Sequence, residues 1–481
     1  MAYKDFREFL AALETDGRLR RITVPVDPAG ELSCMARWMY QALPEERRFA
    51  LLFEKLRGVD GRLVTAALGA SRQTYALALG VAPDLITERW VQALCRPIAP
   101  VDTTVAPCQE LVTTGADVDL GRLPVPVWTP GKDAAPYLTT LTLTRDADSG
   151  IQNLAVYRTM VAGKDKVLVN LSPGRHGTRC WQSYLRQGRP APIAWAIGCE
   201  PAVHMAAVAN VPYGVDEMTI AGGLKGEPIA LVKAKTIDLM VPANAEYIIE
   251  GEIRPGEFDQ EGPFGEFAGY MGPVASKPVA TITAITCRRD PIYYGYVSQM
   301  PPSESTIIQS LGNAGLMLKQ LRHDLGHASV RDVHIDLTYG GVLAHGIVAM
   351  KPLYPGHAKQ VGRLVADLSF LKRVTVVDED VDIRDAMHMD WALNARYNPR
   401  RDTVIVDDVF CPADMDPAVP RVDGKPGINS KIVIDATEKT ESGTFSLPPA
   451  EDMDRALALW KEAGLPSFDI PKRCKFMLSR G

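Results

Sequence analysis

Two glutamates in one short loop are the residues whose types and spacing most directly suggest chemistry. Glu261 and Glu266 bracket a Gly-Pro-Phe-Gly turn in the segment EGPFGEFAGY, residues 261–270. When two carboxylates are held close together in an apolar loop, their repulsion raises the pKa of one of them. A carboxyl group shifted in this way can act as a general acid near neutral pH. Two unrelated glutamates in a solvated turn would explain the same spacing.

An asparagine and an arginine, separated by four residues, occur in a predicted strand with the sequence NLAVYR, residues 153–158. Positions 153 and 158 point to opposite faces of a regular strand unless a bulge intervenes. Inside a barrel, Arg158 requires a carboxylate partner because an unpaired buried charge is unfavourable. Glu261 or Glu266 could supply it. A structural ion pair at the rim of a barrel would account for Arg158 equally well.

Two further turns carry polar side chains that suit a phosphate and a metal ion. The Ser-Pro-Gly turn before Arg175 and His176 can present backbone N–H groups and a positive charge to a phosphate. Glu217 ends the segment GVDE. Together, Asn153, His176 and Glu217 form a mixed nitrogen and oxygen set that suits Mn²⁺ or Mg²⁺. A lone histidine is usually structural, so each of these signals is weak when taken separately.

The segments around these residues fall into four regions. Residues 1–105 alternate helical and extended patterns and predict a small α/β domain. Residues 106–302 contain short β-branched runs between Gly and Pro turns, one of them at 246–253, which favours an antiparallel barrel or sandwich with a helix at 201–210. Residues 303–330 form one long amphipathic stretch, predicted to be a linker helix. Residues 331–481, with a strand expected at 342–350, alternate again as a C-terminal α/β domain. The predicted fold class is α+β.

Composition excludes several classes of protein. The 481 residues are 46% hydrophobic and 23% charged with a formal net charge of −5, so no bulk positive charge attracts nucleic acid or an anionic membrane. No window approaches the roughly 18 uncharged apolar residues of a membrane span. The amphipathic, acid-containing N-terminus is unlike a signal or transit peptide. The eight scattered cysteines include no CxxC pair, which indicates free thiols and a cytoplasmic location.

Taken together, in this order and spacing, these segments resemble the UbiD-like family of prenylated-FMN-dependent (de)carboxylases. The resemblance runs along nearly the whole chain and includes VDEDVD (377–382), WALNAR (391–396) and NSKIVIDAT (429–437). It implies an N-terminal α/β domain, a central split β-barrel of the flavin-binding type and a C-terminal α/β oligomerisation domain. The regions predicted from the sequence pattern agree with this arrangement.

The resemblance also implies which residues hold the cofactors. Mn²⁺ (or Mg²⁺) would be bound by Asn153, His176 and Glu217 and would bridge to the phosphate of prenylated FMN, with K⁺ beside it. The residues expected to bind the prenylated FMN are Asn153, Arg158, Arg175, His176, Glu217 and Lys431.

The catalytic set implied by the resemblance is an ionic network of Arg158, Glu261 and Glu266. The cofactor supplies the electron sink that decarboxylation of an aromatic acid needs. The protein then has to orient the substrate, exclude water from it and deliver a proton. Arg158 would orient Glu266, which would protonate the carbon that has lost CO₂, and Glu261 would help to hold the charge state of the network. By its position, the segment MPPSES (300–305) is expected to line the substrate pocket.

The expected activity is reversible, non-oxidative decarboxylation of an aromatic, heteroaromatic or hydroxyarylic acid. The expected partners are this small acid, CO₂ and a flavin prenyltransferase that supplies the cofactor, and the chain is expected to form a homodimer or homohexamer. Two alternatives are a decarboxylase of an aryl-CoA thioester and a non-catalytic flavin- and metal-binding subunit. A plain FMN redox enzyme is a third. The sequence cannot place the arginines that a CoA entrance would use: Arg72, Arg89, Arg96, Arg396 and Arg400.

Overall fold

The computed structural model describes residues 3–337, 345–411, 427–439 and 446–471, together with positions 416, 418, 419, 473 and 474. The chain forms two compact units. The first comprises Met1–Lys319, Leu337–Leu343 and Pro412–Gly427, and the second comprises Gln320–Asp336, Ala344–Cys411 and Ile428–Gly481. One hydrophobic cluster extends from Phe6 to Leu311 and includes residues on both sides of position 105. The domain boundaries predicted from the sequence therefore stay predictions.

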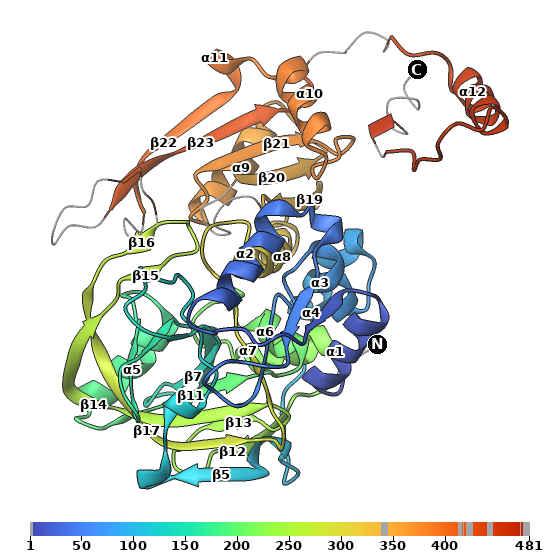
Figure 1. The fold of residues 1–481 in the computed structure, drawn as a ribbon. Coiled ribbons are helices and arrows are strands. Elements are labelled where there is room, and N and C mark those ends of the chain that lie inside the picture. Colours follow the sequence, from blue (N-terminus) through green and yellow to red (C-terminus); the bar gives the residue numbers. More distant parts are fainter. Residues whose placement is uncertain are drawn as a thin grey trace. The chain divides into compact units, whose positions relative to one another are not determined.

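The N-terminal part of the first unit is the predicted alternation of helices and strands (Figure 1). The first helix, α1 (Phe6–Thr15), begins after Asp5, whose side chain accepts a hydrogen bond from the Glu8 N–H, and it buries one apolar face. The strands form a sheet in the order β1-β2-β3-β18. The remaining elements are β1 (Leu19–Ile22), α2 (Glu31–Ala42), β2 (Ala50–Phe53), β3 (Arg62–Thr65), α3 (Arg72–Leu79), α4 (Ile86–Cys95) and β18 (Ile292–Tyr294).

A nine-stranded antiparallel sheet, curled into a half-barrel, forms the centre of the first unit (Figure 1). Its strand order is β6-β9-β10-β17-β14-β11-β7-β8, and β5 pairs with β17. This sheet is the barrel-like element that the short β-branched runs predicted. Its strands are β5 (Leu111–Thr114), β6 (Tyr137–Leu138), β7 (Leu141–Arg145), β8 (Gln152–Val156), β9 (Thr159–Val161), β10 (Lys166–Val169), β11 (Ala191–Ile197), β14 (Tyr247–Glu261) and β17 (Ala275–Cys287).

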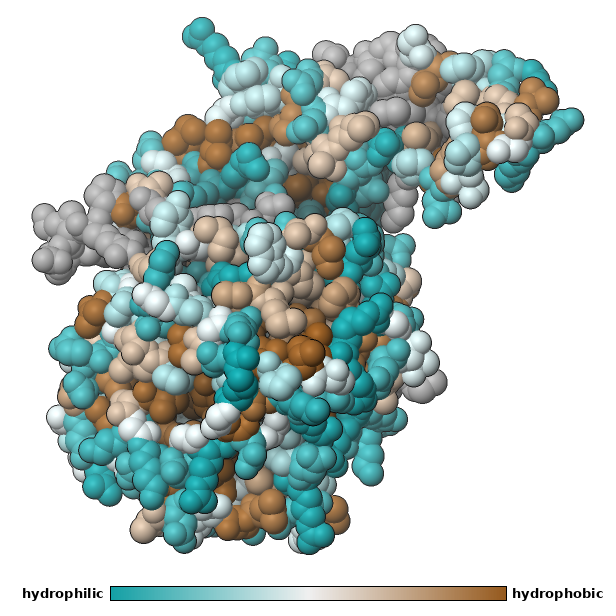
Figure 2. Space-filling view, viewed as in Figure 1, coloured by the Kyte–Doolittle hydropathy of each residue, from teal (hydrophilic) through white to brown (hydrophobic). Residues whose placement is uncertain are grey.

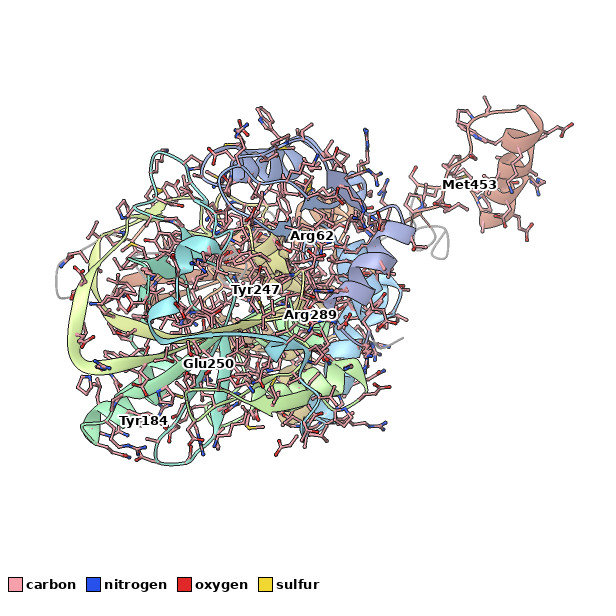
Figure 3. All side chains as sticks on the ribbon, turned by 60° about the horizontal axis from the view of Figure 1, so that its bottom comes forward. Arg62, Tyr184, Tyr247, Glu250, Arg289 and Met453 are labelled. Atoms are coloured by element: carbon pink, nitrogen blue, oxygen red, sulfur yellow. The ribbon has the colours of Figure 1, made fainter. Side chains whose placement is uncertain are left out.

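Strand β14 is longer than its sequence pattern predicts. Tyr247 and Glu250 lie in its buried first half (Figure 3), and the predicted strand ends at residue 253. The structure continues β14 to Glu261 through an exposed Arg-Pro-Gly segment, with a register shift against β17 between Ile253 and Phe258. A proline is tolerated in a strand where such an irregularity removes it from the hydrogen-bond ladder. The extension ends at Glu261, one of the two candidate glutamates.

The other elements of the first unit surround this sheet. Helix α6 ends at Ala206, so residues 207–210, which were expected to be helical, form a loop. Helix α8 ends at Lys319, where a π-helical turn (Gln320–Asp324) begins the second unit. The elements are β4 (Val101–Asp102), α5 (His176–Arg186), α6 (Pro201–Ala206), α7 (Glu217–Lys225), β12 (Ala230–Lys233), β13 (Met240–Pro242), β15 (Phe264–Gly265), β16 (Met271–Gly272) and α8 (Glu304–Lys319).

The second unit is built on a five-stranded mixed sheet in the order β19-β20-β21-β23-β22. Its alternation of strands and helices matches the predicted C-terminal α/β pattern, although the first residues of the strand expected at 342–350 lie outside the described residues. The elements are β19 (Val330–Ile335), β20 (His345–Met350), α9 (His357–Asp367), β21 (Arg373–Asp378), α10 (Ala386–Arg396), α11 (Pro399–Asp402), β22 (Thr403–Phe410), β23 (Ile428–Ala436) and α12 (Ala450–Glu462).

Two expectations from the composition concern membrane-spanning helices and the state of the cysteines. Within the described ranges, no helix combines the length and the apolar character needed to cross a bilayer. All eight cysteines lie at described positions, and all are free thiols.

Candidate active site

Three side chains that were predicted to bind a metal meet in the first unit. Asn153 lies on β8, whereas His176 and Glu217 are the first residues of α5 and α7. Helix α7 begins here because Asp216 caps it by accepting the Met218 N–H. The Oε2 atom of Glu217 accepts the backbone N–H of Leu154 on β8 at 2.8 Å, and its Oε1 atom lies 3.8 Å from Nδ1 of His176.

The amide of Asn153 shows that this group of side chains fits a cation. Its Nδ2 atom donates to Thr144 Oγ1 at 3.1 Å, so its Oδ1 atom is the free end of the amide. That oxygen is buried and has no hydrogen-bond partner among the described residues. A buried acceptor without a donor is unfavourable unless another group binds it. An amide oxygen, an imidazole nitrogen and a carboxylate together suit a divalent ion such as Mn²⁺ or Mg²⁺.

The second group is the predicted network of one arginine and two glutamates. Arg158 holds Glu261 with two hydrogen bonds, from Nε to Oε1 at 3.0 Å and from Nη2 to Oε2 at 2.9 Å. Its Nη1 atom pairs with Oε1 of Glu266. The side chain of Glu261 is fully buried, and those of Arg158 and Glu266 are about one-tenth exposed. The bidentate pair fixes the plane of the guanidinium group, which in turn fixes where Glu266 binds.

Glu266 stands at the turn of a very short hairpin. Strands β15 and β16 pair antiparallel, with Phe264 opposite Gly272. The hairpin closes through bonds from Glu266 N–H to the Tyr270 carbonyl at 2.8 Å and from Gly269 N–H to the Glu266 carbonyl at 2.9 Å. A side chain at position 272 would approach both Glu266 Oε1 and Arg158 Nη1 to about 3 Å. Glycine at this position therefore leaves room for the ion pair.

An interruption of the sheet brings Asn153 and Arg158 to the same cavity. In a regular strand these two positions would point to opposite faces. Strand β8, however, ends at Val156 and β9 begins at Thr159, so Tyr157 and Arg158 do not continue the pleat. The structure therefore supplies the irregularity that the sequence pattern required.

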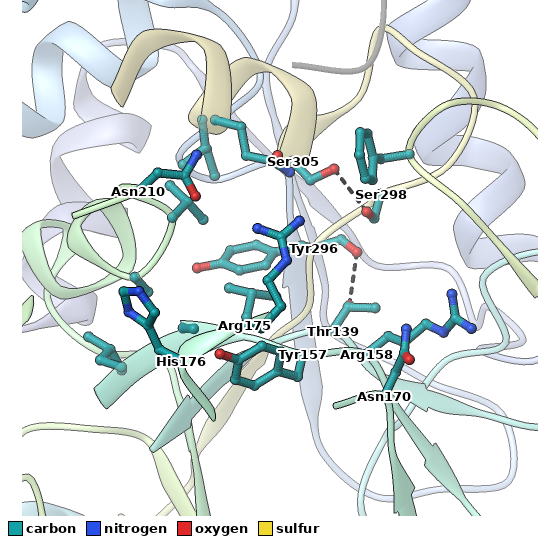
Figure 4. Close-up of a pocket in the computed structure, with 18 of the residues that line it drawn as sticks. Thr139, Tyr157, Arg158, Asn170, Arg175, His176, Asn210, Tyr296, Ser298 and Ser305 are labelled. Atoms are coloured by element: carbon teal, nitrogen blue, oxygen red, sulfur yellow. Dashed lines mark hydrogen bonds between the residues drawn. The ribbon is translucent and has the colours of Figure 1, made fainter. Parts of the chain in front are cut away.

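Five of these six side chains line one cavity of about 300 Å³, and the sixth, Glu261, lies buried behind Arg158. Figure 4 shows His176 on one side of it and Arg158 on the other, with Arg175 and Tyr157 between them. The loop after α6 borders it, and Ser305 of the predicted MPPSES segment also lies on the wall. The apolar part of the wall is formed by Leu154, Val156, Val208, Val211, Phe264, Phe267 and Ile308.

The two remaining predicted cofactor residues lie in different units. Arg175 precedes α5 and lines the cavity, and its guanidinium group forms no ion pair with any described residue. Lys431 lies on β23 in the second unit, where its ammonium group donates to the carbonyls of Ala366 and Ser369. Burial lowers the pKa of Lys431. Its assignment to the cofactor stays a prediction.

Two residues that no sequence motif predicted hold the network in place. Tyr137 donates its hydroxyl to Oε1 of Glu261 at 3.1 Å, and its ring lies 4.3 Å from that of Phe264. Asp133 accepts the backbone N–H of Gly265. Both belong to a segment, TPGKDAAPY, whose only sequence signal is that of a turn. Their partners lie more than 120 residues away, so no local pattern could identify them.

Three family models match successive parts of the chain. They describe the N-terminal domain, the Rift-related domain and the C-terminal domain of 3-octaprenyl-4-hydroxybenzoate carboxy-lyase, UbiD. The residues matched are 10–94, 99–301 and 306–436, respectively. The matches therefore extend from the first helix to the last strand of the second unit's sheet.

Solved structures give the same result. An evolved dimeric form of the UbiD-class enzyme HmfF from Pelotomaculum thermopropionicum, in complex with prFMN, is 33% identical with a TM-score of 0.80 over 93% of this chain and 97% of that one. Vanillic acid decarboxylase from Sedimentibacter hydroxybenzoicus is 28% identical with a TM-score of 0.84 over 96% and 100% of the two chains. A 3,4-dihydroxybenzoic acid decarboxylase from Enterobacter cloacae is 26% identical, with a TM-score of 0.80 over 95% and 100%.

The chain belongs to the UbiD family of carboxy-lyases. The family predicted from the sequence motifs is thereby confirmed, as are the enzyme class and the mixed α/β fold with a half-barrel sheet.

Proposed function

We propose that this protein is a prenylated-FMN-dependent, non-oxidative decarboxylase of an aromatic, heteroaromatic or hydroxyarylic acid, with Glu266 as its acid/base. One observation carries the proposal. Glu266 uses one carboxylate oxygen to pair with Arg158, while its other oxygen accepts no hydrogen bond from the residues that the structure describes. Glu266 also lines the cavity. A carboxylate that is anchored at one oxygen and available at the other can transfer a proton to a bound substrate.

Each member of the network has a distinct task in this proposal. Arg158 holds Glu266 in one rotamer and stabilises its charged form while the acid binds. Glu266 accepts the carboxyl proton of the substrate acid and, once CO₂ has left, delivers that proton to the carbon that carried the carboxylate, so that the acid yields only the decarboxylated product and CO₂. Glu261 neutralises the arginine from the opposite side through the bidentate pair, so that the guanidinium group stays fixed as the charge on Glu266 changes.

Asn153, His176 and Glu217 would hold Mn²⁺ (or Mg²⁺) at the other side of the cavity, with K⁺ nearby. Arg175 would add a second positive charge toward the cofactor phosphate. When bound, prenylated FMN supplies the electron sink that cleavage of an aryl–carboxylate bond requires. The unpartnered Oδ1 atom of Asn153 and the unpaired guanidinium group of Arg175 support this end of the proposal.

The cavity wall supports an aromatic substrate that carries a polar group. Phe264, Phe267 and Ile308 are apolar and would exclude water from a ring. Ser298 and Ser305 share a hydrogen bond at 2.9 Å on the same wall and could bind a ring substituent. Two of the similar structures are decarboxylases of vanillic acid and of 3,4-dihydroxybenzoic acid, which are both hydroxyaryl acids.

We further propose a cytoplasmic homodimer or homohexamer. Helix α12 has no buried residue, and Met453 lies exposed on it (Figure 3). Leu459 is also exposed, whereas Trp460 contacts Phe468 of the same chain. Hydrophobic side chains gathered at a surface (Figure 2) are typical of a subunit interface. The free thiols are consistent with a reducing compartment.

Native mass spectrometry with metal analysis tests the proposal directly. The chain is produced with and without a flavin prenyltransferase, under anaerobic conditions, and is then screened for CO₂ release from aryl, heteroaryl and hydroxyaryl acids and from an aryl-CoA thioester. We expect a mass increment of prenylated FMN plus one Mn²⁺ per chain, and turnover of a free acid by the co-produced protein only.

Substitutions test the metal-binding side chains separately from the catalytic network. His176→Ala and Glu217→Ala should lose Mn²⁺ and cofactor together, whereas His323→Ala, which changes an exposed histidine, should lose neither. Full cofactor occupancy in the first two variants would contradict the metal assignment. Turnover with FMN alone would contradict the assignment of prenylated FMN. A loaded protein without any decarboxylation would favour a non-catalytic subunit.

A further inference from the structure

The hairpin that carries Glu266 is held along its outer edge by a turn from a distant part of the chain. Its inner edge is paired between β15 and β16, which leaves the Gly265 N–H pointing the other way. That N–H donates to Oδ1 of Asp133 at 2.9 Å. Just before it in the chain, the carbonyl of Pro263 accepts the N–H of Ala134 at 3.0 Å. The turn at 129–134 thus contacts the backbone on both sides of Phe264.

Asp133 is itself fixed by its own turn. Its Oδ2 atom accepts the Thr129 N–H at 2.7 Å, and its backbone N–H donates to the Thr129 carbonyl at 2.9 Å. The carboxylate therefore bridges two backbone N–H groups, one in each segment. The contact is also close in space, because a Cβ atom at Gly265 would lie 2.5 Å from Oγ1 of Thr129.

The surroundings of the Asp133 carboxyl act on it in opposite directions. Burial raises the pKa of Asp133, and the two backbone N–H donors and the nearby guanidinium group of Arg37 oppose that effect. Arg37 in turn is held by the carbonyl of Trp128 at 3.1 Å and by the hydroxyl of Thr129 at 3.3 Å. A charged acceptor binds a backbone N–H about twice as strongly as a neutral one.

We propose that Asp133 is a positioning residue for decarboxylation, which fixes the Gly265–Glu266 peptide so that Glu266 meets both Arg158 and the reacting carbon. This inference rests on the proposed role of Glu266. Asp133 does not line the cavity and touches no reacting atom, so it acts only through the backbone of the hairpin. The same segment also reaches Glu261 through Tyr137, and it therefore holds both glutamates of the network.

Two variants and a matched control test this role in the full-length holoenzyme. Asp133→Ala removes the acceptor, and Asp133→Asn keeps the size of the side chain and one neutral acceptor oxygen. Asp119→Ala is the control, because Asp119 also accepts a glycine N–H at 2.9 Å, from Gly121, but lies outside the site. The readouts are amide exchange of the peptide that contains Gly265, cofactor occupancy by absorbance, and kcat and KM for the acid that the wild-type enzyme turns over.

For Asp133→Ala we expect exchange at the hairpin to rise at least about 10-fold and kcat to fall about 10- to 100-fold, since small displacements of a catalytic group have effects of this size. KM and cofactor occupancy should change less than about twofold. For Asp133→Asn, both kcat and the exchange rate at the hairpin should lie between those of Asp133→Ala and the wild type. Asp119→Ala should match the wild type throughout.

An unchanged kcat or unchanged exchange at Gly265 in Asp133→Ala would overturn the proposal. A loss of activity that merely follows a loss of cofactor would also overturn it, because that pattern marks a general structural role. The exchange measurement needs no substrate. A screen that finds no decarboxylated acid would therefore count against the proposed function, while the contact made by Asp133 is still tested.

Discussion

The molecule contains two clusters of the same kind, one in each unit, in which an arginine binds two carboxylates beside an aromatic ring. In the first unit, Arg158 binds Glu261 and Glu266 and lies 5.4 Å from the centre of the Phe264 ring. In the second unit, an arginine binds two aspartates beside a tryptophan ring at 5.1 Å, and the residues are Arg396, Asp378, Asp380 and Trp391. Both arginine side chains are close to fully buried, with exposures of 11% and 4%.

The difference lies in whether a carboxylate of the cluster faces a cavity that could hold a substrate. Both oxygens of Asp380 accept hydrogen bonds from Arg396, and Oδ2 of Asp378 accepts both Arg396 and the Glu438 N–H. Among the described residues, the Glu266 carboxylate pairs with Arg158 alone, and it faces a cavity. An arginine with two carboxylates over a ring is therefore not a catalytic signature by itself. The chemistry requires a carboxylate oxygen that is still available and a space for a substrate.

The largest expected effect comes from removing the available carboxylate. Glu266→Gln keeps the size of the side chain but cannot carry a proton to the substrate, so kcat should fall about 10³-fold, within the range for loss of a general acid. Cofactor occupancy should remain, because the metal set is untouched. Steady-state CO₂ release and absorbance spectra of the purified holoenzyme measure the two quantities.

A matched change on β14 controls for the loss of a negative charge. Glu252→Gln alters a partly exposed glutamate away from the cavity and should leave kcat within about twofold, as most surface substitutions do. Near-wild-type activity in Glu266→Gln would remove the distinction between the two clusters.

The corresponding change in the second unit should affect stability instead. Arg396→Gln leaves two largely buried aspartates without their cation, which should lower the free energy of unfolding of this unit by about 3–5 kcal/mol. Urea unfolding followed by tryptophan fluorescence reports it, since Trp391 stacks on Arg396. Arg400→Gln, which changes an exposed arginine, is the control. A large drop in kcat in an Arg396→Gln variant that is fully folded would show that the second cluster serves catalysis too.

The second cluster should also give the unit a pH dependence. Burial raises the pKa of Asp378 from 3.8 to about 6, despite the neighbouring Arg396. Because the folded state binds this proton more tightly than the unfolded state, the stabilisation is fully present below about pH 4 and is lost as the pH rises through 6, by about 1–3 kcal/mol. Asp378→Asn should flatten this slope in unfolding experiments between pH 4 and 7. The same slope in the variant and the wild type would assign it to another group.

The smallest expected effect concerns the support of Glu261. Tyr137→Phe removes one hydrogen bond to Glu261 and should reduce kcat about 3- to 10-fold, which corresponds to about 1 kcal/mol. Tyr293→Phe is the matched control, because the hydroxyl of Tyr293 is buried without a hydrogen-bond partner among the described residues. If both variants behave alike, Tyr137 contributes packing alone.

Local sequence patterns were sufficient for most of the elements. Helix α1 and the short strands follow from apolar periodicity and from turn residues, and these signals act over a few neighbouring positions. They fail at β14, where a proline and a glycine stop the predicted strand although tertiary pairing with β17 continues it to Glu261. They also predict a helix that continues to residue 210, whereas α6 ends at Ala206.

The site was predictable to the extent that its residues lie in distinctive motifs. The six residues of the two groups, which are Asn153, Arg158, His176, Glu217, Glu261 and Glu266, were all named from sequence, and the structure brings them to one cavity or its edge. Asp133 and Tyr137 were missed because their function depends on contacts with a loop far along the chain. Supporting residues of this kind are defined by tertiary structure, not by spacing.

The bond between Leu154 N–H and Glu217 joins a strand and a helix that lie 63 residues apart. Neither segment presents the ligand set alone, so in the proposed enzyme the metal can enter only after β8 and α7 have docked. Cofactor binding then distinguishes correctly folded chains, since a chain with a misassembled half-barrel cannot bind the metal and the cofactor. In protein produced with excess cofactor, the fraction of loaded molecules would then set a lower bound on the fraction of chains that completed their fold.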